Sequence, residues 1–190
     1  RHETGGGPRL PTRPEHVESG QSVRKHRDHP ARLDGDALTA LAGRASMLTE
    51  CRNPPILTPH PGEMARLAVD ATTQSVNADR IGTARRFARE RGVFVVLKGA
   101  RTVIARPDGL VAICPTGNPG MATAGTGDVL TGMIVGLLAQ RVPVWEAACA
   151  ATYFHGLAGD LASRRLGQPG RLAGDLLAQI PLALQNTKTI

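Results

Sequence analysis

The sequence predicts an α/β domain in which helices flank a mostly parallel sheet. Two apolar runs, residues 55–58 and 93–97, are typical of strands that are buried on both faces. Residues 36–48 and 77–91 carry apolar side chains at helical spacing instead. Strands that alternate with helices along a chain are typical of a layered α/β fold.

The other elements follow from turn residues and from periodicity. Gly92 is placed to end the helix at 77–91, because glycine readily adopts the left-handed conformation found just after a helix. The sequence Pro-Asp-Gly at 107–109 predicts the turn of a hairpin. The strands expected on either side of that turn are 102–106 and 110–113, and the further helices are 61–69, 126–140, 144–165 and 172–184.

The composition fits one globular domain that binds small molecules. A chain of 190 residues with 41% hydrophobic and 21% charged residues can form a single core. Aromatic residues make up only 3%, which leaves few side chains on which nucleic-acid bases could stack. The net charge of +7 is spread along the chain without a long basic run. We therefore expect anionic small molecules, and no nucleic acid, as partners.

The first 33 residues differ from the rest of the chain. They hold three consecutive glycines at 5–7, four prolines and four of the six histidines, and they show no apolar periodicity. This composition predicts a disordered tail at 1–33 and a folded domain at 34–190.

The cysteines and the hydropathy indicate a cytoplasmic protein. Cys51, Cys114 and Cys149 are far apart and odd in number, so they predict neither a disulfide framework nor a zinc site. The longest apolar helical stretch is interrupted by glycines and is too short for a membrane span. We also expect no signal peptide, since no apolar segment follows Arg1.

The most informative stretch is NPGMATAGTGDVLTG at 118–132. Small residues at 124–127 let the backbone approach a ligand closely, and a helix is expected to begin there. The first amides of a helix lack intrahelical partners and form an anion hole suited to phosphate. Asp128 in the first turn could then take a proton from an attacking hydroxyl. It could equally be a residue that only caps the helix.

Four motifs together resemble the ADP/ATP-dependent NAD(P)H-hydrate dehydratases, which belong to the ribokinase-like superfamily. The resemblance covers about residues 34–179, leaves 1–33 unmatched, and corresponds to the C-terminal portion of the family's domain. It implies a ribokinase-like layered fold without the family's N-terminal strands. The motifs are LDGDAL at 33–38, with Gly35 where the family usually has Ala, TPHPGEMARL at 58–67, VLKGART at 96–102, and the stretch at 118–132 with its GTGD.

The resemblance also implies a role for each matching residue. Asp128 is implied as the catalytic base and as a contact of the hydrated substrate. His60 and Asn118 are implied as further substrate contacts, Asn118 by holding the loop that faces the substrate. The anion hole is implied at Gly125, Thr126 and Gly127. The adenine nucleotide is implied at Lys98, Gly99, Ala100, Arg101 and Thr102, with Gly127 also against it.

Most of these residues have a plainer interpretation. His60 lies between two prolines and could be an exposed turn residue, and Lys98 could be an ordinary lysine at a strand end. Glu63 is expected to be a carboxylate in the first turn of a helix. Asp36 could simply cap its helix. His155 lies in an alanine-rich helix and is expected to be a core histidine.

The implied reaction is the ADP- or ATP-dependent dehydration of hydrated NADH or NADPH. Asp128 would deprotonate the substrate hydroxyl, which would attack the terminal phosphoryl group; expulsion of phosphate would then restore the dihydropyridine ring. Mg²⁺ is expected to arrive with the phosphates, and no dedicated metal site is expected. The resemblance leaves a homo-oligomer open.

Two other functions stay open. The chain could be a small-molecule kinase that stops after phosphoryl transfer, although the TPHPGE motif argues against this. It could also be a truncated remnant that at most binds nucleotide. A sheet without its first strands would leave an edge and apolar helix faces uncovered, so we expect the chain as given to be weakly active or inactive and marginally stable alone.

Overall fold

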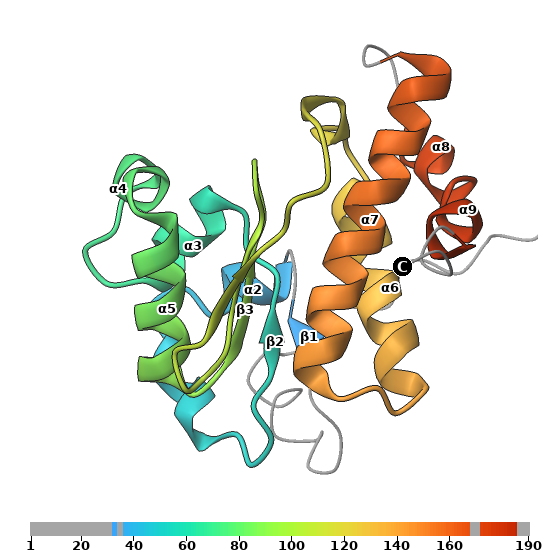
Figure 1. The fold of residues 1–190 in the computed structure, drawn as a ribbon. Helices are drawn as coiled ribbons and strands as arrows, with labels where there is room; N and C mark the ends of the chain where they lie inside the picture. The colour runs from blue at the N-terminus through green and yellow to red at the C-terminus, as the bar shows by residue number, and fades with distance from the viewer. Residues whose placement is uncertain (1–31, 34–35, 168–171, 186–190) are drawn as a thin grey trace, which may run out of the picture.

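A five-stranded sheet runs through the described part of the protein, which in the computed structural model comprises residues 32–33, 36–167 and 172–185 (Figure 1). The strands lie in sequence order, and β1 pairs with β2, and β2 with β3, in parallel. β4 pairs antiparallel with both β3 and β5. The expected α/β class is confirmed, but the sheet is mixed because the hairpin extends it. The strands are β1 (Arg32–Leu33), β2 (Ile56–Leu57), β3 (Phe94–Leu97), β4 (Val103–Ala105) and β5 (Val111–Ile113).

Helical connections join the three parallel strands, as parallel pairing requires. A short helix and a 3₁₀ helix follow β1, and three helices connect β2 to β3. These elements are α2 (Asp36–Ala40), η1 (Ala45–Glu50), α3 (Pro61–Leu67), α4 (Thr73–Ala78) and α5 (Arg80–Arg91).

The two long helices expected before β3 are each divided in the structure. The helix expected at 36–48 ends early, because Gly43 takes a left-handed conformation with φ 72°. The helix expected at 77–91 is interrupted at Asp79, whose side chain accepts a 2.7 Å hydrogen bond from Gly82 N and so caps α5. Gly92 ends α5 with φ 65°, as the sequence predicts.

The chain after the hairpin is helical. A 3₁₀ turn, η2 (Pro119–Met121), precedes α6 (Thr126–Ala139), and α7 (Val144–Leu166) follows. The bounds of α6 and α7 agree with the sequence to within one residue at each end. The last expected helix, 172–184, is instead divided into α8 (Ala173–Leu177) and α9 (Ile180–Gln185).

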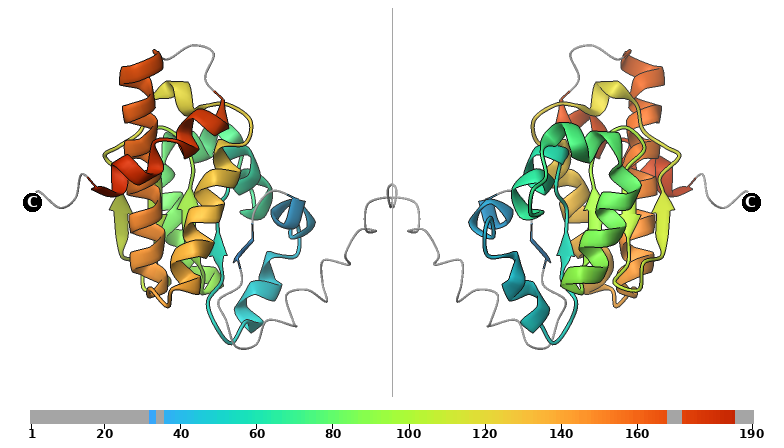
Figure 2. Two further views of the ribbon diagram at one scale, coloured as in Figure 1. Left: turned by 90° about the vertical axis from the view of Figure 1, so that its right-hand side faces the viewer. Right: turned by 90° about the vertical axis from the view of Figure 1, so that its left-hand side faces the viewer.

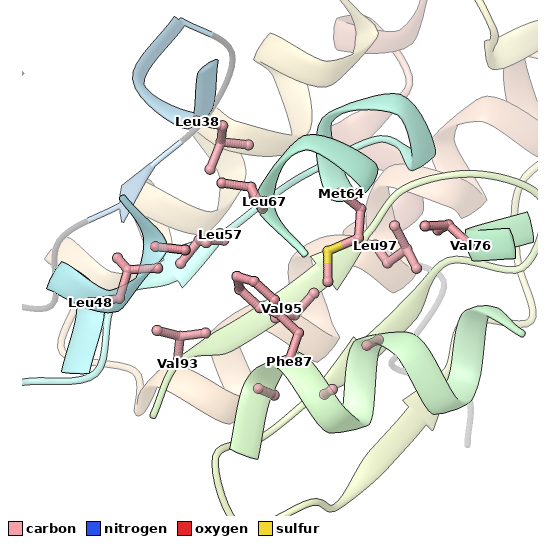
Figure 3. Packing of buried hydrophobic residues seen from close by; sticks show 14 of the residues in the cluster. Leu38, Leu48, Leu57, Met64, Leu67, Val76, Phe87, Val93, Val95 and Leu97 are labelled. Carbon is pink, nitrogen blue, oxygen red and sulfur yellow. The ribbon is translucent and has the colours of Figure 1, made fainter. Parts of the chain in front are cut away.

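The sheet separates two layers of helices (Figures 1 and 2), and apolar side chains fill both of its faces. Val95 and Leu97 of β3 pack with α2 to α5 on one face, in the cluster drawn in Figure 3. Val96 of β3 and Ile56 of β2 pack on the other face with residues of α6 and α7. The strand at 93–97 is therefore covered on both faces, as its apolar run predicts. By the same alternation, Lys98 continues the face that α6 and α7 cover.

Most of the expected N-terminal tail lies outside the described residues. Arg32 and Leu33, which the sequence assigned to that tail, form β1 and pair with β2. None of the helices in the described residues combines the length and the apolar character that crossing a membrane requires.

Candidate active site

Three of the sequence motifs meet at the carboxyl end of the parallel strands. TPHPGE follows β2 and KGART follows β3, and Lys98 N donates a 2.8 Å hydrogen bond to Pro59 O. α6 begins beside them, since a Cβ atom at Gly127 would lie 3.5 Å from Lys98 Nζ. The carboxyl ends of parallel strands are where α/β folds commonly bind ligands.

His60 caps the first turn of α3. Its Nδ1 accepts hydrogen bonds from Gly62 N at 3.0 Å and from Glu63 N at 3.3 Å, so in the neutral ring the proton is on Nε2. Glu63 completes a capping box by accepting from His60 N at 2.7 Å. The His60 side chain is 51% exposed, so its free edge can still face a ligand.

Glu63 also connects two of the motifs. The expected first-turn carboxylate is confirmed, and its side chain is only 9% exposed. Its Oε2 lies 3.7 Å from Lys98 Nζ, and its Oε1 lies 3.6 Å from His60 Nε2. The Lys98 ammonium group therefore lies between the buried Glu63 and the start of α6.

The start of α6 has the geometry of an anion hole. Gly125 precedes the helix with φ 86°, and its position has no side chain that could cap the helix. The Thr126 hydroxyl faces the preceding loop: Oγ1 lies 2.8 Å from both Met121 O and Thr123 O, which share its single proton. Gly127 and Asp128 supply the next amides of the first turn, and the Asp128 side chain is exposed.

The turn after β3, which we call the nucleotide turn (residues 98–102), has an unusual backbone. Gly99 has φ 137° and Arg101 has φ 57°, and both residues are exposed. Thr102 Oγ1 closes the turn with a 3.2 Å hydrogen bond to Gly99 O. A positive φ at an arginine is uncommon and indicates that the surrounding structure imposes this conformation.

Arg80 at the start of α5 holds the nucleotide turn, and sequence reasoning missed it. Its guanidinium donates to Leu97 O at 2.9 Å, to Lys98 O at 3.1 Å and to Ala100 O. Partial burial lowers the pKa of Arg80 from its ordinary value, although the group stays charged at neutral pH. Its carbonyl acceptors lie 17 to 20 residues away in sequence, so no local pattern indicates the contact.

Asn118 lies in the loop that precedes α6, which we call the anion loop (residues 116–125). Its Nδ2 donates a 2.8 Å hydrogen bond to Asp160 Oδ1 of α7, and Gly117 N donates to Asp160 Oδ2 at 2.9 Å. The Asn118 side chain thus connects this loop to α7 through Asp160. The sequence analysis did not single out Asp160.

His155 of α7 reaches the same region from the other side. Its Nε2 lies 2.9 Å from Thr126 O, the carbonyl of the first residue of α6. Burial lowers the pKa of His155, so the ring is neutral and donates through Nε2–H. We expected a core histidine from the sequence; in the structure His155 is largely buried and contacts the first turn of α6.

The described residues contain no group of three or more His, Cys, Asp or Glu side chains placed to hold a metal ion. A Mg²⁺ ion at this site would need phosphate oxygens among its ligands, as Mg²⁺ commonly has in nucleotide enzymes.

The fold and the site first define the class of protein, which is the ribokinase-like superfamily. The structure superimposes on a ribokinase-like superfamily protein from Enterococcus faecalis with a TM-score of 0.73 and 30% identity, over 88% of this chain and 57% of the other. It superimposes with a TM-score of 0.79 on the ADP/ATP-dependent NAD(P)H-hydrate dehydratase from Bacillus subtilis co-crystallized with ATP/Mg²⁺. The identity is 36%, over 88% of this chain and 59% of the other.

The sequence then defines the family. Residues 7–182 match the NAD(P)H-hydrate dehydratase family, and the chain belongs to it. The bifunctional NAD(P)H-hydrate repair enzyme Nnr from Moorella thermoacetica is 50% identical over 180 residues, which are 95% of this chain and 34% of that protein. The chain thus spans about a third of this relative. The match begins at residue 7, so our expected limit of about residue 34 for the resemblance was wrong.

Proposed function

We propose that the chain carries the catalytic machinery for ADP- or ATP-dependent dehydration of hydrated NADH and NADPH. The observation that supports this most strongly is the meeting of the GTGD helix start, Lys98 and the TPHPGE turn at one end of the sheet. In this arrangement a base, an anion hole and a cation lie close together.

Asp128 is the proposed base. Its exposed carboxylate lies in the first turn of α6, where a bound phosphoryl group would face the helix amides. It would take the proton of the substrate hydroxyl while that oxygen forms a bond to the terminal phosphorus of the nucleotide. The bond from that phosphorus to its bridging oxygen breaks at the same time, and the shortened nucleotide leaves.

Backbone amides and one lysine would hold the transferred group. The Gly127 and Asp128 amides and the Lys98 ammonium are positive groups that converge on one place. A Cβ atom at Gly127 would be in ordinary van der Waals contact with Lys98 Nζ, at 3.5 Å, so the ammonium group lies beside the first turn of α6. The nucleotide turn, Lys98 to Thr102, is proposed to hold the remaining phosphate and the ribose.

Mg²⁺ would neutralise charge on the phosphate oxygens when it is bound with the nucleotide. Among the described residues, the exposed Asp128 carboxylate in the first turn of α6 is the proposed neighbour of such an ion. The chain's own residues supply the remaining orientation and charge.

Phosphorylation converts a poor leaving group into a good one. The lone pair of the ring nitrogen then expels phosphate from the neighbouring carbon. The ring carbon next to that one loses a proton to water, and the new double bond restores the dihydropyridine. We propose that the exposed edge of His60 faces the hydrated ring and that Asn118 lies on the opposite side, in its loop.

We further propose a cytoplasmic enzyme whose partners are the nucleotide and the hydrated cofactor. The three cysteines at positions 51, 114 and 149 are free thiols, which suits a reducing compartment.

The test is recovery of the reduced cofactor. The purified chain is incubated with hydrated NADH, Mg²⁺ and either ADP or ATP, and the NADH absorbance is followed together with release of phosphate. The proposal expects one phosphate for each NADH, and no recovery without nucleotide. Phosphate transfer that leaves a stable phosphorylated product would indicate a kinase instead.

A further inference from the structure

One side of α7 lies against the anion loop and the start of α6. We call Tyr153, His155, Gly156, Gly159 and Asp160 the loop platform, since their spacing of three and four residues places them together on the helix. The platform binds the beginning of the loop firmly. Thr116 Oγ1 donates to Tyr153 O at 2.8 Å, and Asp160 accepts from both Gly117 N and Asn118 Nδ2.

The two glycines of the platform let α7 and the loop touch. A Cβ atom at Gly156 would lie 2.3 Å from Thr116 Oγ1, and one at Gly159 would lie 2.2 Å from Met121 Sδ. Both distances are far below van der Waals contact. At Gly156 the backbone carbon of Thr116 would also lie 2.7 Å away, so a side chain there would push the loop away from the helix. At Gly159 the side chain of Met121 would have to move instead.

The platform also fixes the other end of the loop. His155 Nε2 holds Thr126 O, and this carbonyl shares a peptide unit with Gly127 N–H. In a planar trans peptide the C=O and N–H bonds point in opposite directions. Because the carbonyl is turned towards α7, the Gly127 N–H is turned away from α7. A hydrogen bond accepted by that carbonyl also polarises the unit and makes the N–H a stronger donor.

We infer that His155 and Asp160 are positioning residues for phosphoryl transfer, and that Asn118 acts as the partner of Asp160 on the anion loop. Asp160 sets the start of the loop, and His155 orients a donor of the anion hole. The inference rests on the proposed function, because it assigns these residues a part in that reaction. It also implies that the Asn and Asp side chains at positions 118 and 160 can be swapped without loss of function.

An exchange of the two side chains tests the Asp160 contact. Asp160→Asn alone brings an NH₂ group against Asn118 Nδ2 or Gly117 N, so one hydrogen bond is lost. Adding Asn118→Asp restores both: the new carboxamide oxygen at 160 accepts from Gly117 N, and its NH₂ group donates to the new carboxylate at 118. The full-length chain is used for every variant.

Two readouts are compared in this series. Asp160→Asn should raise the KM for hydrated NADH about tenfold and speed amide hydrogen exchange across residues 117–127. The double variant should return the exchange rates and the KM to within about twofold of the wild type.

A second series tests His155. His155→Gln keeps an N–H donor, whereas His155→Leu removes it at similar volume. The dissociation constant of ADP with Mg²⁺ should rise about tenfold in the leucine variant and less than about threefold in the glutamine variant.

The outcomes separate this inference from the proposed function. A double variant that recovers slow exchange but not the KM would overturn the role of Asn118, because its amide would then contact the substrate itself. Equal ADP affinity in both His155 variants would overturn the role of His155. A wild-type chain that neither binds ADP nor restores NADH contradicts the proposed function. In that case the rates of amide hydrogen exchange in the anion loop still decide whether the loop platform holds the loop.

Discussion

The nucleotide turn and the anion loop are both held from behind by a helix, but in different ways. Arg80 of α5 alone binds three carbonyls at the nucleotide turn. The anion loop is bound at several points by α7, through a backbone carbonyl, a carboxylate and an imidazole. One side chain of the supporting helix therefore binds the carbonyls at the turn, whereas several groups of the supporting helix bind the loop. Loss of one residue should accordingly loosen the turn more than the loop.

The two supports also differ in charge. Arg80 adds a positive charge behind the turn proposed to bind phosphate, and each carbonyl that it occupies turns a backbone N–H the other way. Asp160 adds a negative charge behind the loop proposed to face the hydrated ring. The two supports thus make the nucleotide side more positive than the substrate side.

The largest effect is expected at Asp128, which lies in the first turn of α6, directly after the anion loop. Asp128→Asn removes the base and keeps its shape, so kcat should fall by at least about two orders of magnitude. ADP binding should change little, because the amides of α6 remain. Asp108→Asn, in the exposed hairpin turn, is the control and should keep full turnover. An Asp128→Asn variant with near-normal kcat in the NADH recovery assay would remove Asp128 from the mechanism.

The next largest effect is expected at Arg80. Arg80→Leu leaves three carbonyls without their charged donor, so the KM for ADP should rise about thirtyfold and the free energy of unfolding should fall by about 2–3 kcal/mol. Arg86→Leu on the same helix removes an exposed ion pair with Asp79 and a 3.5 Å hydrogen bond to Thr83 Oγ1, and should cost less than about 1 kcal/mol. Similar losses in the two variants would show that the turn does not depend on Arg80.

A smaller effect is expected at Lys98. Lys98→Ala removes one cation from the phosphate site, so the increase in melting temperature produced by ADP should shrink and the dissociation constant should rise about tenfold. Lys98→Arg keeps the charge beside Glu63 and should retain most of the affinity. If the melting temperature of the alanine variant responds to ADP as the wild type does, Lys98 is not a phosphate ligand.

The smallest effect is a dependence on pH. Burial lowers the pKa of His155 in the folded chain, so the unfolded chain binds a proton more readily. His155 therefore stabilises the fold fully above its unfolded pKa of about 6.5, and this contribution is lost as the pH falls towards the folded value. Urea unfolding at several pH values should show a gentler decline for His155→Gln. If the free energy of unfolding falls equally with pH in the wild type and in His155→Gln, burial of His155 does not contribute to the pH dependence.

The sequence predicted elements whose signals are local. The apolar run at 93–97, the Pro-Asp-Gly hairpin and the glycine after α5 all appear in the structure as expected. The divisions at Gly43 and Asp79 were missed because both breaks lie inside continuous helical periodicity, which a single residue interrupts.

The candidate site likewise combines local motifs, which the sequence predicts, with contacts between distant residues, which it does not. The GTGD stretch and the two turns were identified because their chemistry lies in consecutive residues. Arg80, His155 and Asp160 were missed because each contact joins residues 17 to 43 positions apart in sequence. Such contacts depend on how two helices pack behind the loops, and a single sequence carries no local pattern for that.

The glycines of the loop platform have a consequence for protein engineering. Replacing helical glycines by alanine usually stabilises a protein, by up to about 1 kcal/mol at each position. Gly132 and Gly136 of α6 suit this strategy, because a Cβ atom there would meet nothing within 4 Å. Gly156 does not, since its Cβ would also lie 2.7 Å from the backbone carbon of Thr116. A thermostabilised variant of this protein would therefore gain rigidity along α6, whereas the same substitution at Gly156 would displace the loop on which turnover is proposed to depend.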